Sequence, residues 1–129
     1  MSQTEPPTGS VEQICDADLT SLNTLRLPAR SHRLARPGTL DALSQVLAER
    51  NPAEPLFVIG EGSNLVIRAD LPGLTLSLAI DGMAQVKEDD THVWVAAGAG
   101  VHWDDLVAWT VEQGWQGLEN LSLIPGTAG

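Results

Sequence analysis

Between residues 32 and 59 the sequence reads as a strand, a helix and a second strand. Thr39 has the side chain of an N-cap, and the helix that it begins runs to about Arg50, where Asn51-Pro52 ends it. The apolar run at 56–59 then has the length and composition of a strand. A crossover of this kind joins parallel strands, so these residues predict a sheet that is parallel in part. The apolar face of the helix consists of Leu40, Leu43, Val46 and Leu47.

Further short strands are predicted after the crossover, at 65–67, 74–78 and 93–97. Strict alternation of apolar and polar residues at 74–78 is typical of a strand with one buried face. Turns are predicted at Pro72-Gly73, Asp81-Gly82 and Glu88-Asp89-Asp90.

A second helix is predicted from about 103 to 113, with Gly114 in the position that commonly ends a helix. Its spacing of apolar residues gives one inward face. The residues of that face are Trp103, Leu106, Val107 and Val111.

Composition limits what such a domain can bind. The chain has 129 residues, 43% of them hydrophobic, which is enough for one domain with one core. It has 7 Lys and Arg against 17 Asp and Glu, and the resulting net charge of -10 repels nucleic acid. Backbone N–H groups can nevertheless hold a small phosphate-bearing ligand. We therefore expect a small-molecule ligand and no nucleic-acid partner.

The sequence predicts a cytoplasmic protein with no membrane partner. No apolar run approaches the roughly 18 residues that span a bilayer, and the first twenty residues lack the basic and apolar regions of a signal peptide. Cys15 is the single cysteine and has no neighbour at metal-ligand spacing, so we expect neither an internal disulfide nor a metal site. Residues 1–20 predict a flexible N-terminal leader, and the domain is placed at 21–129.

Two of the glycine-rich stretches differ from the familiar phosphate-binding loops. Gly60-Glu61-Gly62-Ser63-Asn64 has Leu65 where a dinucleotide-binding fingerprint needs its third glycine, and no Lys follows as in a P-loop. A plain β-turn is the alternative interpretation of this stretch. The second, Gly98-Ala99-Gly100, precedes Trp103, and the acidic pair Asp104-Asp105 would repel a phosphate from the helix start. We interpret it as a tight structural turn.

The third stretch, from Leu123 to Gly129, has two glycines three residues apart with small residues between them. Its N–H groups could point into a common site with those of 60–64. The two stretches together, in an acidic chain without a cluster of basic side chains, are what a pyrophosphate site lined with backbone amides would look like in a sequence.

These motifs resemble those of one enzyme family. Asn23-Thr24, then GEGSNLVI at 60–67, and finally GLENLSLIPGTAG at 117–129 are similar to the N-terminal FAD-binding part of the UDP-N-acetylenolpyruvoylglucosamine reductases. GEGSN is shared with the wider group of vanillyl-alcohol-oxidase-type flavoproteins, whereas GLENLSLIPG is more specific. The resemblance covers residues 20–129.

The resemblance implies an α+β fold, the FAD-binding fold of the vanillyl-alcohol-oxidase or PCMH type. The chain would contain the first subdomain and the start of the second, truncated at the C-terminus and without the substrate-binding domain. Relatives in the wider group attach FAD through a histidine in or near the GEGSN loop, and because this stretch has none we expect noncovalent FAD. The cofactor-binding residues implied are Asn23, Thr24, Gly60, Glu61, Gly62, Ser63, Asn64, Leu65, Ile124, Pro125, Gly126, Thr127, Ala128 and Gly129.

The family reaction passes hydride from NADPH to FAD and then to the enolpyruvyl double bond of a UDP-sugar, which gives UDP-N-acetylmuramate for peptidoglycan synthesis. The serine, arginine and glutamate that the family uses for catalysis follow the IPG segment. They would lie beyond Gly129, so no catalytic residue is expected here and the chain alone should be inactive. The implied partners are the UDP-sugar substrate and NADPH, and we expect a monomer.

Two other functions stay open at this point. One is another FAD-dependent oxidoreductase of the same superfamily, and the other is a degenerate flavin fold that acts as a non-catalytic interaction module. The scattered residues His32, His92 and His102 are expected to be surface or strand residues. Trp94 and Trp103 fit core positions, and Trp115 is a candidate neighbour of the cofactor.

Overall fold

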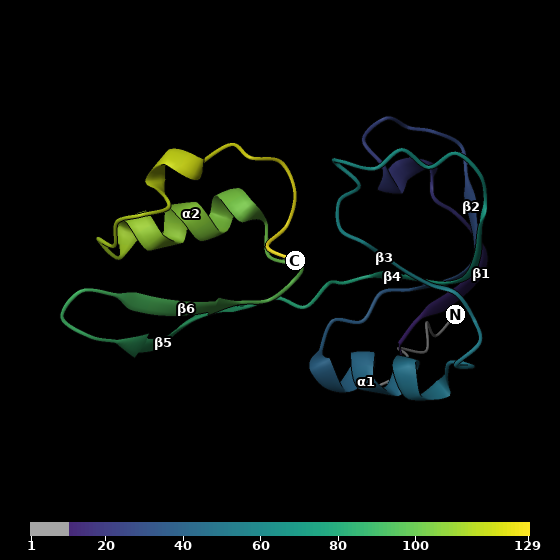
Figure 1. The fold of residues 1–129 in the computed structure, drawn as a ribbon, viewed down its shortest axis with the longest axis horizontal. Helices are drawn as coiled ribbons and strands as arrows, with labels where there is room; N and C mark the ends of the chain where they lie inside the picture. Colours follow the sequence, from purple (N-terminus) through teal and green to yellow (C-terminus); the bar gives the residue numbers. More distant parts are fainter. Residues whose placement is uncertain (1–10) are drawn as a thin grey trace, which may run out of the picture.

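The computed structural model describes residues 11–129 and has two lobes (Figure 1). The first lobe contains a four-stranded sheet with one helix, and the second contains a two-stranded hairpin with the other helix. The first-lobe elements are β1 (Gln13–Asp18), the 3-10 turn η1 (Thr20–Leu22), β2 (Arg30–Ala35), α1 (Leu40–Glu49), β3 (Leu56–Ile59) and β4 (Leu71–Ser77). The second-lobe elements are β5 (Met83–Glu88), β6 (Val93–Ala97), α2 (Trp103–Glu112) and the 3-10 turn η2 (Glu119–Leu121).

The predicted crossover is confirmed. The strand order in the first sheet is β1-β2-β4-β3, and both β2 and β3 pair with β4 in parallel. β4 therefore lies between the two strands that α1 connects. The hairpin of β5 and β6 turns at 88–92 as expected, although the sequence reading did not identify β5 as a strand.

The interior position of β4 corrects two predictions. Ser77 and the four residues before it are all buried, because α1 and the loops cover both faces of the sheet; the alternating pattern had indicated one buried face. Pro72-Gly73, predicted as a turn, lies inside β4. Ser31 pairs with Leu71 but Arg33 pairs with Leu74, so the strand has one extra residue between them. Pro72 and Gly73 therefore form a bulge, a place where a sheet tolerates proline.

Residues 65–67 were wrongly predicted as a strand. They belong to the loop between β3 and β4, and only Ile67 is buried, in a cluster with Leu19 and Ala29. A short apolar run becomes a strand only where a neighbour can pair with it, and here the run anchors a loop instead.

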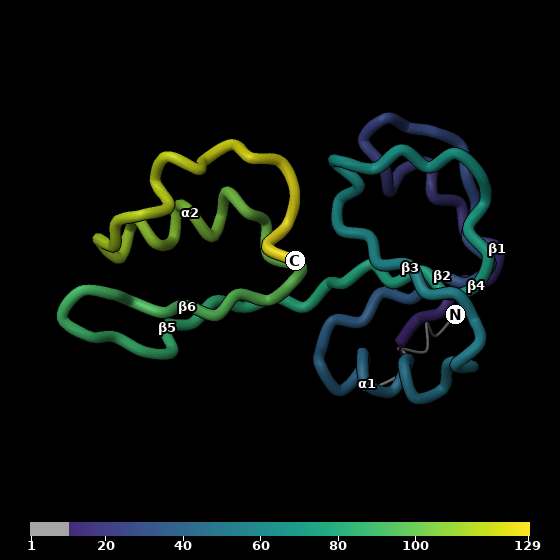
Figure 2. Tube along the Cα trace, in the orientation of Figure 1, coloured from purple at the N-terminus to yellow at the C-terminus, as the bar shows by residue number. Residues whose placement is uncertain are grey.

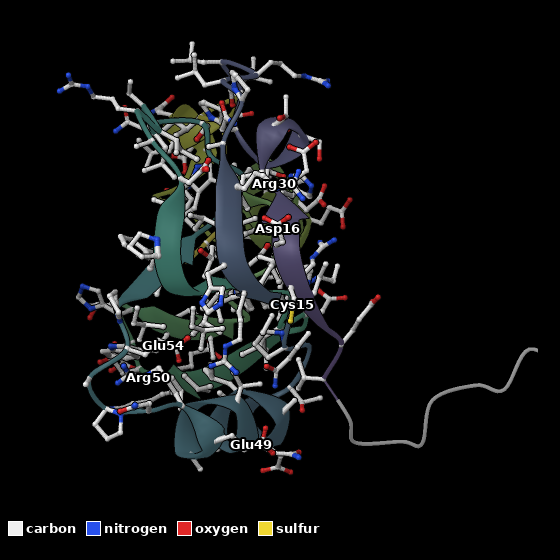
Figure 3. All side chains as sticks on the ribbon, turned by 90° about the vertical axis from the view of Figure 1, so that its right-hand side faces the viewer. Cys15, Asp16, Arg30, Glu49, Arg50 and Glu54 are labelled. Carbon is white, nitrogen blue, oxygen red and sulfur yellow. The ribbon has the colours of Figure 1, made fainter. Side chains whose placement is uncertain are left out.

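The leader boundary at residue 20 is also corrected. Residues 1–10 lie outside the described residues, but 13–18 form β1, which pairs antiparallel with β2. Figure 3 shows Asp16 beside Arg30 on the neighbouring strand, and their ion pair measures 2.7 Å. The ordered fold therefore includes residues assigned to the leader.

Two apolar clusters fill the first lobe, one on each face of its sheet. Leu34 belongs to the cluster under the loops and Ala35 to the cluster under α1, because consecutive strand residues point to opposite faces. Val46 is the buried residue of α1, and Leu43 packs beside it. Leu40 and Leu47 are exposed, so the predicted apolar face is wider than the face that packs.

The ends of both helices agree with the sequence reading. The Thr39 hydroxyl accepts from the Ala42 N–H at 3.1 Å and caps α1, and Gly114 has a φ of +78° after α2. The inward face of α2 differs in part: Leu106 and Val107 are buried, but Thr110 takes the inward position predicted for Val111, which is 49% exposed. No helix within 11–129 is both long and apolar enough to cross a membrane.

Candidate functional site

A cleft of about 810 Å³ lies between the two lobes, at the carboxyl edge of the parallel strands. Arg36 directly follows β2, Gly60 directly follows β3, and Ser77 ends β4; all three border the cleft. The carboxyl ends of parallel strands are the usual place for ligands in such sheets. The chain crosses between the lobes after β4, and its C-terminus returns to the point where they meet (Figure 2).

The GEGSN loop is held from behind by the segment at 22–24. Gly62 has a φ of +65°, and a Cβ there would lie 2.2 Å from the Leu22 carbonyl oxygen. The Thr24 N–H donates to the Gly62 carbonyl at 3.2 Å. Gly62 is therefore required by backbone packing, in addition to the cofactor contact that the resemblance implies for it. A plain β-turn would not need this support.

Asn23 organises the supporting segment. Its side chain is only 2% exposed. The Nδ2 group donates to the Leu19 and Leu27 carbonyls, both at 3.0 Å, and Oδ1 accepts from the Leu27 N–H at 2.9 Å. These bonds use most of the hydrogen-bonding capacity of the amide, so Asn23 acts on the site by shaping the loop that borders it.

The third glycine-rich stretch meets the GEGSN loop, as the sequence reading proposed. A Cβ on Gly60 would lie 3.1 Å from Thr127 Oγ1, and the Ser63 hydroxyl donates to the Pro125 carbonyl at 3.5 Å. A second, smaller pocket of about 330 Å³ is bordered by residues of both loops. Two segments that are far apart in the sequence thus form one surface.

The tail from 124 onward is tied to the turn before α2. The Trp103 N–H donates to the Gly126 carbonyl at 3.0 Å, and the Ala128 N–H donates to the Val101 carbonyl at 2.8 Å. The turn at 98–100 is structural, as predicted, but for another reason: a Cβ on Gly98 would lie 2.2 Å from the Ile80 carbonyl. Gly98 and Gly100 make room for the backbone of the segment 79–81, which connects the two lobes. The turn can therefore lie against this segment, and the tail is bonded to the residues that follow the turn.

Asp104 holds the chain before the tail. Its Oδ1 accepts from the Leu123 N–H at 2.8 Å and from the Ser122 hydroxyl at 2.7 Å. These two hydrogen bonds hold the pKa of the Asp104 carboxyl below its ordinary value. We expected this carboxylate to serve the start of α2; it serves the segment at 122–123.

His102 contacts the GEGSN loop. Its Nε2 lies 2.9 Å from Oε1 of Glu61, an ion pair when the imidazole is protonated. We expected His102 to be a surface or strand histidine, and no spacing rule could have connected residues from two lobes. A histidine therefore stands beside the loop in space although the loop itself contains none.

The structure brings most of the predicted cofactor residues together. Those that border the cleft are Asn23, Thr24, Gly60, Glu61, Ser63, Pro125 and Thr127. Those that border only the smaller pocket are Gly62, Asn64, Leu65, Gly126 and Gly129. Ile124 and Ala128 border neither. Arg26 and Arg36 also line the cleft, and the sequence reading did not include them.

The tryptophans differ from expectation. Trp94 is 40% exposed and lies under the Lys87 ammonium, so it is not a core residue. Trp115 packs edge-on against Trp109 and borders a separate pocket beside β6, which the GEGSN loop does not reach. Trp103 is half-buried and donates its indole N–H to the Leu121 carbonyl at 2.7 Å. None of the three lines the cleft.

Comparison with known proteins agrees with this geometry. The profile of a family described as FAD binding domain matches residues 31–129. The chain belongs to this family. This FAD-binding domain is 84% identical over 129 residues to the UDP-N-acetylenolpyruvoylglucosamine reductase of Alcanivorax borkumensis. It is 51% identical over 119 residues to the reductase of the same name in Azoarcus sp., and that match covers 88% of this chain. The predicted resemblance is confirmed.

The FAD-binding domain spans 37% of the Alcanivorax borkumensis protein and 34% of the Azoarcus sp. protein. Its fold is similar to the crystal structure of UDP-N-acetylenolpyruvylglucosamine reductase from Thermus caldophilus, with a TM-score of 0.63 and 26% identity over 92% of this chain and 40% of that one. The expected α+β FAD-binding fold is thereby confirmed.

The residues of the cleft fit an FAD group. Ligand pockets commonly have volumes of about 300–1,000 Å³, and the cleft falls within that range. Gly60 leaves no side chain between the loops, and Ser63 and Thr127 place short polar groups at its border. Backbone amides, hydroxyl groups and two arginines are suitable partners for a diphosphate.

Proposed function

We propose that this domain is the FAD-binding part of an NADPH-dependent reductase that acts on enolpyruvyl UDP-N-acetylglucosamine. The product would be UDP-N-acetylmuramate, a precursor of peptidoglycan. The observation that carries the proposal is the 84% identity, along the whole chain, to a protein named UDP-N-acetylenolpyruvoylglucosamine reductase. The cleft bordered by two fixed glycine-rich loops supports it.

In this proposal the chain binds and orients the cofactor. The GEGSN loop and the tail would hold the diphosphate through backbone N–H groups, and the Ser63 hydroxyl would exchange its 3.5 Å bond to the Pro125 carbonyl for one to a phosphate oxygen. FAD, when bound, supplies the hydride-transfer chemistry. The two lobes would enclose the cofactor between them and limit its contact with water.

The remaining expectations stay predictions. The reductant would be NADPH, the protein would be a cytoplasmic monomer, and FAD would be held noncovalently. Noncovalent binding has a direct test because His102 lies beside the loop: acid denaturation of the loaded protein should release all of its flavin into the supernatant. Flavin that stays with the precipitated polypeptide would contradict this part of the proposal.

The main test uses the protein at its native length. We expect it to bind FAD, seen as the visible absorption of flavin after gel filtration, and to consume NADPH only when the enolpyruvyl UDP-sugar is present. If the protein binds flavin but consumes NADPH at the same rate with and without this UDP-sugar, the result would favour another FAD-dependent oxidoreductase. A protein that stays colourless after incubation with FAD would favour a non-catalytic module.

A further inference from the structure

The basic residues of this acidic chain have an uneven distribution. Among its 7 Lys and Arg, most are engaged away from the cleft: ion pairs hold Arg30 and Arg33, backbone carbonyls hold Arg50, and the Trp94 ring holds Lys87. Within residues 11–129, Arg26 and Arg36 form no ion pair, and both line the cleft between the lobes. Arg68 is the other cation of 11–129 with neither an ion pair nor one of these partners, and it lies in a groove beside β3, so two of the three such cations line the candidate site.

The backbone at both arginines is held by neighbouring structure. Arg36 follows the carboxyl end of β2, the strand at the centre of the first sheet beside β4. Arg26 has a φ of +53°, and its N–H donates to the Asn23 carbonyl at 3.0 Å. Its backbone conformation is therefore set by the loop that the buried Asn23 side chain organises. Neither side chain depends on a flexible terminus for its place.

The acidic residues of the cleft have other partners or come from other elements than the arginines. Glu61 contacts His102, and Asp81 accepts from the Gly82 N–H at 2.7 Å. Asp81 and Asp105 belong to the connecting segment and to α2, whereas the arginines come from the first lobe. A chain with a net charge of -10 repels phosphates at long range, and cations within the cleft offset part of that field.

We propose that Arg26 and Arg36 bind the phosphate oxygens of the ligand in this cleft and make the site selective for a phosphorylated flavin. This inference rests on the proposed function, because it takes FAD as the ligand. It changes the mode of binding expected from the sequence, which relied on backbone amides without basic side chains. Guanidinium groups donate strong, charge-assisted hydrogen bonds to phosphate, and they add to the amides of the two loops.

The test compares FAD with riboflavin, which lacks phosphate, on the native-length protein. Arg26→Gln and Arg36→Gln should each weaken FAD binding about tenfold, the effect of losing one hydrogen bond from a charged donor in a partly solvated site. Riboflavin binding should stay within about twofold of the wild type, because no phosphate contact is lost. The affinity of the double variant for FAD should also depend less on salt concentration.

Two further variants keep the test decisive. Arg68→Gln removes the same charge from a groove beside β3, away from the cleft, and should leave FAD binding unchanged. Arg36→Lys keeps the charge and should recover part of the affinity. Wild-type affinity for FAD in both glutamine variants, or equal losses for FAD and riboflavin, would overturn the inference while leaving the proposed function intact. A wild-type protein that binds no FAD would overturn both.

Discussion

The carboxylate of Glu61 and the imidazole of His102 lie 2.9 Å apart and join the two lobes across the cleft. Glu61 belongs to the loop after β3, and His102 immediately precedes α2. The pair therefore connects the GEGSN loop to the turn that carries the C-terminal tail. Together with the hydrogen bond from Ser63 to the Pro125 carbonyl, it holds the two walls of the site against each other.

Replacement of either partner should alter the site more than the stability of the fold. The side chains of Glu61 and His102 are 36% and 61% exposed, and exposed ion pairs are worth at most about 1 kcal/mol. Glu61→Gln and His102→Gln should each lower the free energy of unfolding by less than that, measured in urea. The double variant should lose no more than the larger single loss, since both remove one interaction. A loss of several kcal/mol in either would show that the pair is essential to the fold.

Gly62→Ala should strongly destabilise the protein. The new Cβ would meet the Leu22 carbonyl at 2.2 Å, and the φ of +65° is unfavourable for alanine. Strain at the backbone alone costs about 1–3 kcal/mol, and the steric clash adds to it. Denaturant unfolding measures the loss.

Gly114→Ala is the matched control for that substitution. Gly114 has a similar φ of +78° but no atom within 4 Å of the added Cβ, so it tests the backbone term alone at about 1 kcal/mol. Equal losses at the two glycines would show that the GEGSN loop is not packed against 22–24.

Asn23→Ala should destabilise the protein even without a ligand. Its amide is buried and satisfies three backbone groups, and each group left without a partner costs about 1–3 kcal/mol. Thermal unfolding of the apo protein should shift to a lower temperature. Asn23→Asp keeps the acceptor for Leu27 N–H but loses the donors, so it should also be destabilised. Unchanged apo stability in Asn23→Ala would mean that this residue acts only through the cofactor.

Acid should release the tail from α2. Because the folded pKa of Asp104 is depressed, its contribution to stability is present above the ordinary value of 3.8 and is lost as pH falls through the lower folded pKa. Hydrogen exchange at the Leu123 amide should accelerate over that pH range. Asp104→Asn, which still offers an acceptor oxygen, should remove this pH dependence. Asp105→Asn removes a neighbouring charge and should leave it unchanged.

The parts of the fold that depend on local chemistry could be predicted from the sequence. The cap at Thr39, the stop at Gly114 and the crossover of α1 each arise from residues a few positions apart. The conformation of residues 65–67 could not be predicted in the same way, because a strand there would need a pairing partner that the fold does not provide. Likewise, nothing local showed that β1 would attach to β2.

The same difference between local and long-range features applies to the candidate site. The glycine-rich motifs identified both loops, since a backbone that turns or packs closely is visible in composition. The structural roles of individual residues could not be predicted in this way: Gly62 packs against the Leu22 backbone, and the Asn23 side chain bonds to the backbone of its own loop. Arg26 and Arg36 show no pattern in the sequence, because only the topology brings the end of β2 and the loop after η1 to one cleft.

The packing of Gly62 against 22–24 has a kinetic consequence. A loop that is already fixed from behind needs no rearrangement when a ligand arrives, so little entropy is lost in ordering it. Association at this loop should therefore follow a single fast phase whose rate rises in proportion to ligand concentration, with residence time determined by how quickly the ligand leaves.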